Sequence, residues 1–176
     1  MKSGIPLRPI IASIHGPTTL ISKFLNDLLT SIFFNVARQT TFINSIDVVR
    51  KLDKYVANGY LKLTTKFVTI DITDLDTMIP RQGALIALAQ FCIRNSKQGK
   101  IGIFTIDHIM RMARLILDTN CFAYENKYYR QIRGLAMGSA FTQVLVNIYM
   151  FEWEQDLIKY QTSHDEIYGR CVLRNT

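Results

Sequence analysis

Three short segments of the chain carry residue types that could take part in chemistry. Asp71 lies near the end of the apolar run Phe67–Ile72, and a carboxylate at the end of a buried strand is a candidate metal ligand. Arg8 stands between two prolines, where its guanidinium could hold a phosphate. The segment Gly134–Ser139 is a glycine turn that leads into the helix predicted from residue 140.

Each of these features also has a purely structural explanation. Asp71 could be hydrogen-bonded to neighbouring backbone amides, and Arg8 could brace a loop. The glycine turn could simply connect two elements. For each segment taken alone, we favour the structural explanation. The case for a chemical role therefore depends on how the segments are combined and ordered.

The charge of the chain favours a polyanionic partner such as nucleic acid. Lysine and arginine number 21 against 14 acids, which gives a net charge of +7 at pH 7. The basic residues are scattered singly and no run marks a patch. The charge therefore also allows a basic protein that has no nucleic-acid partner.

The cysteines and histidines do not have the spacing of a disulfide framework or a zinc site. Cys92, Cys121 and Cys171 lie far apart, which predicts reduced thiols in an intracellular protein. Lys23 and Asp27 interrupt the longest apolar run, so we expect no membrane-spanning segment.

Apolar spacing predicts mostly helices, which must position the candidate residues. Residues spaced three and four apart predict a long helix from Thr18 to about Phe33 and a second from Asn44 to Asn58. We expect further helices at 80–93, 105–120 and 140–160.

Strands are predicted at two places. The branched residues of Phe67–Ile72 predict a buried central strand, and residues 122–132 predict a hairpin turning at Glu125–Lys127. This order of helices and strands suits one α+β domain that is helix-rich with a small antiparallel sheet.

Taken together, the motifs resemble those of the reverse transcriptases of Penelope-like retroelements across nearly the whole chain. Gly4–Ile11 resembles the fingers motif of that family, and Phe67–Pro80 resembles its first palm motif. The segment Tyr129–Ser139 is similar to the family signature Tyr-x-Gln-x-x-Gly-x-x-Met-Gly-Ser, and it is the most specific of the three. The resemblance implies a partial right-hand polymerase fingers and palm.

The resemblance also implies a two-magnesium nucleotidyl transfer directed by an RNA template, from deoxynucleotide triphosphates to a DNA primer. Asp71 would be the catalytic, metal-bridging carboxylate, and the carbonyl of Ile72 would add a second oxygen ligand for Mg²⁺. The nucleotide-binding residues would be Arg8, Asp74, Leu75 and Asp76. The residues in contact with template and primer would be Gln131, Gly134, Met137, Gly138 and Ser139.

Two departures from the family pattern bear on activity. Asp76 stands where the family has an aromatic side chain that rejects ribose, and a carboxylate there would repel a triphosphate. Glu166–Arg170 resembles the approach to the family's Tyr-x-Asp-Asp motif, but Leu173 and Arg174 follow where the two aspartates are expected. We therefore expect a polymerase that is catalytically incomplete by itself.

The predicted organisation is a partial reverse transcriptase domain at residues 1–170 and a divergent tail at 171–176, without the family's thumb or GIY-YIG endonuclease. A nuclear location suits such a protein. The alternative is a non-catalytic nucleic-acid-binding or assembly module derived from a retroelement. A helical interaction protein without a nucleic-acid role fits the order of the motifs poorly.

Overall fold

The structure is a computed structural model, and it describes residues 16–136 and 138–171. Its helices are α1 (Thr19–Ala37), α2 (Ser45–Ala57), α3 (Leu75–Met78), α4 (Arg81–Asn95), α5 (Ile106–Thr119), α6 (Ala140–Trp153) and α7 (Gln155–Ser163), with a 3₁₀ turn at Arg38–Thr40. Its strands are β1 (Thr41–Phe42), β2 (Lys100–Ile101), β3 (Phe104–Thr105), β4 (Cys121–Tyr124), β5 (Lys127–Arg130) and β6 (Arg170–Cys171). The prediction of a helix-rich α+β fold is therefore confirmed.

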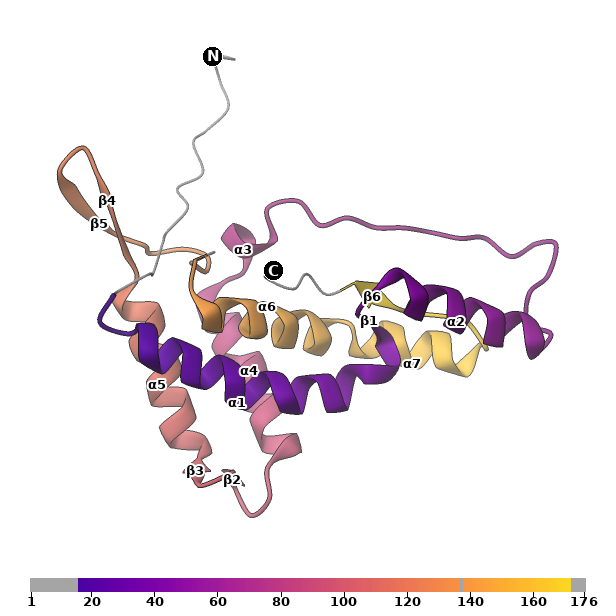
Figure 1. Cartoon of the computed structure of the whole chain (residues 1–176), viewed down its shortest axis with the longest axis horizontal. Coiled ribbons are helices and arrows are strands. Elements are labelled where there is room, and N and C mark those ends of the chain that lie inside the picture. The colour runs from indigo at the N-terminus through magenta and orange to yellow at the C-terminus, as the bar shows by residue number, and fades with distance from the viewer. Residues whose placement is uncertain (1–15, 137, 172–176) are drawn as a thin grey trace.

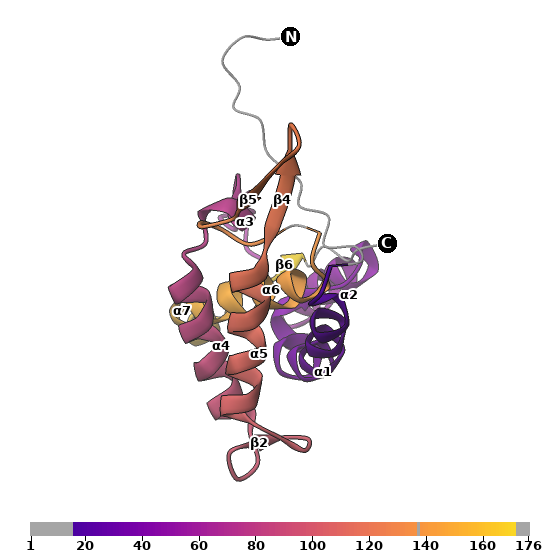
Figure 2. The same cartoon turned by 90° about the vertical axis from the view of Figure 1, so that its left-hand side faces the viewer.

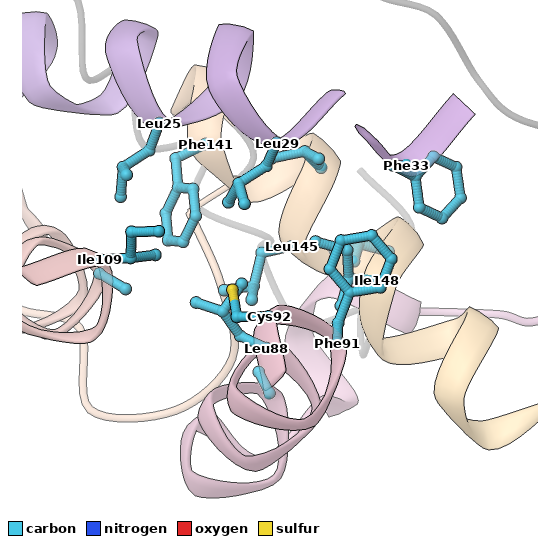
Figure 3. Close-up of a cluster of buried hydrophobic side chains, with 14 of the residues drawn as sticks. Leu25, Leu29, Phe33, Leu88, Phe91, Cys92, Ile109, Phe141, Leu145 and Ile148 are labelled. Atoms are coloured by element: carbon cyan, nitrogen blue, oxygen red, sulfur yellow. The ribbon is translucent and has the colours of Figure 1, made fainter. Parts of the chain in front are cut away.

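Helix α6 lies at the centre of the core, and α1 and α4 pack against it while α5 contacts both of them (Figures 1 and 2). Its sequence is apolar on nearly every face, as expected for a helix surrounded by others. Figure 3 shows how its side chains interlock with those of α1, α4 and α5. The largest fully buried side chains are Phe33, Phe91, Phe141, Leu25, Leu29, Leu88, Ile109, Ile116, Leu117, Leu135, Leu145 and Ile148.

Capping residues fix the starts of two helices where the sequence predicted them. The Asn44 side chain accepts a hydrogen bond from the Asp47 amide at 3.0 Å, at the start of α2. Thr105 accepts one from the His108 amide at 3.3 Å, at the start of α5. These bonds satisfy amides in the first turn of each helix that have no partner within it.

The described residues form three separate two-stranded sheets. β2–β3 and β4–β5 are antiparallel, whereas β1 and β6 pair in parallel. The predicted hairpin is confirmed as β4–β5, and its turn residues Glu125 and Asn126 both have positive φ. That conformation suits the twist of a two-residue hairpin turn.

The predicted buried strand at Phe67–Ile72 is wrong. These residues are extended without strand pairing, and Phe67, Val68 and Ile70 are 70%, 77% and 83% exposed. In the described part of the chain, no backbone hydrogen bond joins residues 66–73 to another segment. A strand needs a partner for its amides and carbonyls, and this run has none there.

Two helix predictions also need correction. The helix predicted at 140–160 is divided at Glu154, where α6 ends and α7 begins. The apolar spacing that predicted α2 indicates a face that could be buried, yet Ile46, Val49 and Val56 are all exposed and α2 has no fully buried residue. An apolar stripe shows which face can be buried, and the neighbouring elements decide whether it is.

Helix α1 and the turn after it, Thr19–Thr40, are long and apolar enough to cross a membrane by length and composition. Leu25, Leu29 and Phe33 of this helix are buried against the rest of the chain. A core helix passes the same test of length and composition, so the finding is weak evidence for a membrane span.

Candidate functional site

The end of the first palm-like motif and the glycine turn meet, although they are far apart in the sequence. The Leu135 amide donates a hydrogen bond to the carbonyl of Asp76 at 2.7 Å. Nearby, Arg81 Nε donates one to the carbonyl of Gly134 at 3.2 Å. Helix α3 and the start of α4 are therefore fixed to the segment that leads into α6.

Gly134 makes this contact possible. Its φ is +67°, and a Cβ atom there would lie 2.7 Å from Thr77 Cα and 2.8 Å from the carbonyl oxygen of Asp76. Real Cβ atoms essentially never come so close to backbone atoms. The glycine is thus required both by the left-handed backbone and by the close approach of α3.

The residues predicted to bind nucleotide lie at the start of α3. Asp74 precedes the helix with φ 60° and ψ 24°, and its carbonyl accepts hydrogen bonds from the amides of Thr77 and Met78, each at 3.0 Å. Leu75 packs partly against the core. Asp76 is partly buried, and burial raises the pKa of its carboxyl. Arg8, the fourth predicted residue, lies outside the described residues.

Asp71 and Ile72 lie on the exposed extended segment just before α3. The described residues contain no group of three or more histidine, cysteine, aspartate or glutamate side chains able to hold a metal ion. A two-metal site needs several carboxylates around the ions. Within the described residues, Asp71 does not belong to such a group.

The predicted template-contacting residues have different environments. Gly138 is exposed and Gly134 is buried under α3, whereas Met137 lies outside the described residues. Gln131 is partly buried, and its backbone amide donates a hydrogen bond to the backbone carbonyl of Asn120 at 3.0 Å. Ser139 is only 2% exposed, and its hydroxyl lies 2.8 Å from that of Ser22.

Ser22 is a structural neighbour of the glycine turn that the sequence reasoning missed. Its hydroxyl oxygen accepts a hydrogen bond from the Phe141 amide at 2.9 Å, in the first turn of α6. A side chain of α1 therefore satisfies an amide at the start of α6 that the helix itself leaves open. The sequence shows a serine on the apolar face of the predicted first helix. It does not show that the partner of this serine, Phe141, lies 119 residues away.

A second polar cluster joins the C-terminal strand to the body, and the sequence reasoning missed it too. Arg170 Nη1 lies 3.7 Å from the Glu154 carboxylate and donates to the carbonyl of Asn147 at 3.2 Å. Lys51 Nζ donates to the carbonyl of Tyr168 at 2.6 Å. Burial raises the pKa of Glu154, and the charge of Arg170 opposes that rise.

Replacing Arg170 with methionine should lower the free energy of unfolding by about 2 kcal/mol at pH 7, because it leaves the buried Glu154 carboxylate without its cation. In the variant, burial holds the folded-state pKa of Glu154 above its ordinary value of 4.5. Folding then favours the protonated acid, so the deficit is largest at neutral pH and shrinks as pH falls toward 4.5. Urea unfolding across this pH range measures it.

Two further variants complete this experiment. Arg111→Met removes an arginine from an exposed pair with Asp107, and it should change stability by less than about 0.5 kcal/mol. Glu154→Gln combined with Arg170→Met should recover much of the loss, since no buried charge remains. A deficit for Arg170→Met that does not depend on pH would show that Arg170 does not act through the charge of Glu154.

No protein-family model, curated protein or solved structure matches this chain.

Proposed function

We propose that the chain carries the fingers and palm part of a reverse transcriptase polymerase domain of the Penelope-like kind. In such an enzyme, the domain would perform template-directed nucleotidyl transfer from deoxynucleotide triphosphates, with an RNA template and a DNA primer. The observation that carries the proposal is the contact of Gly134 and Leu135 with Asp76 and Thr77. Two motifs of a single site must lie together, and these two do.

The proposed roles follow the order of the motifs. Asp71 and the Ile72 carbonyl would contribute oxygen ligands for Mg²⁺, together with further carboxylates that the described residues do not supply. The triphosphate would lie near the start of α3, held by Arg8 and the amides around Asp74 and Leu75. The template would run along the exposed part of the segment before α6.

The chain by itself would bind polynucleotide without extending a primer. Asp76 adds a carboxylate beside the proposed triphosphate site, and Leu173 and Arg174 occupy the sequence positions of the two other expected acids. Binding depends on the positive charge and the shape of the surface, which these changes leave in place. We further propose that the protein acts in the nucleus, where its polynucleotide partners would be.

A second candidate function is a non-catalytic nucleic-acid-binding or assembly module. The exposed apolar segment Phe67–Ile72, whose backbone is unpaired in the described part of the chain, favours it. An extended run of this kind can add to a sheet edge of another protein. The two candidates share the polynucleotide partner and differ in whether Asp71 has a chemical role.

Binding to a primer–template duplex tests the shared part of the proposal. We expect affinity to fall by about tenfold or more between 50 and 200 mM salt, because each neutralised phosphate releases counterions. Little dependence on base sequence is expected, since backbone shape dominates recognition of such duplexes. Fluorescence anisotropy with labelled duplexes of two unrelated sequences measures both, and affinity that does not change with salt would contradict the proposal.

A further inference from the structure

The β4–β5 hairpin projects from the helical body, and its second strand is exposed along its whole length (Figures 1 and 2). Strand β5 consists of Lys127, Tyr128, Tyr129 and Arg130. Tyr128 is 84% exposed, although a tyrosine ring gains free energy by leaving water. An exposed strand made only of two aromatic and two basic residues needs an explanation beyond the packing of this chain.

Strand geometry sorts these side chains into two mixed faces. Side chains alternate along a strand, so Tyr128 and Arg130 project to one face while Lys127 and Tyr129 project to the other. Each face therefore carries one ring and one cation roughly 7 Å apart along the strand. Tyr128 pairs in register with Ala123 of β4.

The hairpin and the residues after it are basic. Lys127, Arg130 and Arg133 are accompanied by a single acid, Glu125, between residues 121 and 133. Arg130 lies 3.1 Å from Asp118 in an exposed ion pair, which is weak and leaves its charge accessible. Neither Lys127 nor Arg133 forms a salt bridge with an acid elsewhere in the described ranges.

We propose that this hairpin binds an unpaired stretch of polynucleotide, with a base stacked on Tyr128, one phosphate held by Arg130 on the same face, and neighbouring phosphates held by Lys127 and Arg133 where the polynucleotide passes around the edge of β5. Stacking on exposed aromatic rings combined with scattered cations is how proteins bind single strands without reading sequence. A duplex keeps its bases stacked inside and cannot use the ring in this way. The inference rests on the proposed function, because it takes a polynucleotide as the partner.

The path of the chain connects this surface with the candidate site. After β5, the chain passes through Ile132 and Arg133, which are both exposed, and reaches Gly134, which lies against α3. An unpaired strand on the hairpin would therefore lead toward the start of α3. This places the single-stranded part of a template ahead of the proposed site of synthesis.

Anisotropy with a labelled single-stranded oligonucleotide and with a duplex tests the proposal on the full chain. Tyr128→Ala should weaken binding to the single strand by about tenfold, the effect expected from losing one stacked base. It should leave duplex binding nearly unchanged, and Tyr128→Phe should retain the wild-type affinity. Tyr160→Ala, which removes another exposed tyrosine on α7, is the matched control and should have no effect.

The salt dependence of binding tests the role of the basic residues separately. Combined Lys127→Gln and Arg133→Gln should reduce the slope of log affinity against log salt by roughly 1.4 for the single strand. The control pair Lys54→Gln and Lys62→Gln removes two exposed lysines, one near the C-terminal end of α2 and one in the segment that follows it, and should leave the slope unchanged.

The possible outcomes separate this inference from the function on which it rests. Wild-type chain that binds no polynucleotide would overturn both. Wild-type binding that Tyr128→Ala leaves intact would overturn only the role of the hairpin. An equal loss for single strand and duplex would overturn the stacking of an unpaired base.

Discussion

Replacing Gly134 with alanine should lower the free energy of unfolding by about 4 kcal/mol. The left-handed φ of +67° alone costs an alanine about 1–2 kcal/mol. The added Cβ would also meet backbone atoms of Asp76 and Thr77 at less than 3.0 Å, and backbone cannot rotate away as a side chain can. Relieving that overlap requires α3 to move away from the turn, which adds a further cost of about 2–3 kcal/mol.

Gly59→Ala is the matched control for this prediction. Gly59 has a similar φ of +74°, but nothing lies within 4 Å of the position its Cβ would take. The control should therefore lose only the conformational part, about 1 kcal/mol. Urea unfolding followed by circular dichroism compares the two variants, and equal losses would mean that the glycine turn does not pack against α3 as described.

The chain supplied with magnesium and deoxynucleotides should extend no primer, whereas a repaired chain should. The repair continues the chain after Arg170 with a family-like Tyr-Ile-Asp-Asp segment and thumb, in place of the tail with Leu173 and Arg174. Restoring the missing carboxylates should raise the rate by about a thousandfold or more, because they stabilise several kcal/mol of charge in the transition state. Extension of a labelled primer on an RNA template measures the rate.

Two substitutions sharpen this experiment. Asp76→Tyr in the repaired chain should raise activity further, since it removes a carboxylate beside the proposed triphosphate site. Asp71→Ala in the same chain should abolish activity. If the unrepaired 176-residue chain already extends a primer in a way that needs Asp71, the proposal that it cannot extend a primer is wrong. An inactive repaired chain that still binds the duplex would favour the non-catalytic module.

Helices were predicted well because their signals are local. The spacing of Leu25, Leu29 and Phe33 marks the buried face of α1, and Thr105 marks the start of α5 within a few residues. The hairpin succeeded for the same reason, since its turn and both strands lie within ten residues of one another. The residues that define each pattern lie within one short segment, so the prediction needs no information about distant segments.

The failures concern partners that are distant in the sequence. Residues Phe67–Ile72 have the composition of a buried strand, but composition does not say which strand lies alongside, and the described residues provide none. The same limit hid the bond between Ser22 and Ser139 and the pair of Glu154 with Arg170. Within the candidate site, the sequence identified Gly134 as important, and only the structure showed that α3 lies against it.

The packing of α1 against α6 means that α1 is made long before its main partner. More than 100 residues separate the end of α1 at Ala37 from the start of α6 at Ala140. At about 5–20 residues per second, synthesis takes roughly 5–20 seconds to cover that interval. Helix α5, which α1 also contacts, precedes α6 in the chain. Completion of this core therefore depends on contacts between segments that are far apart in the sequence.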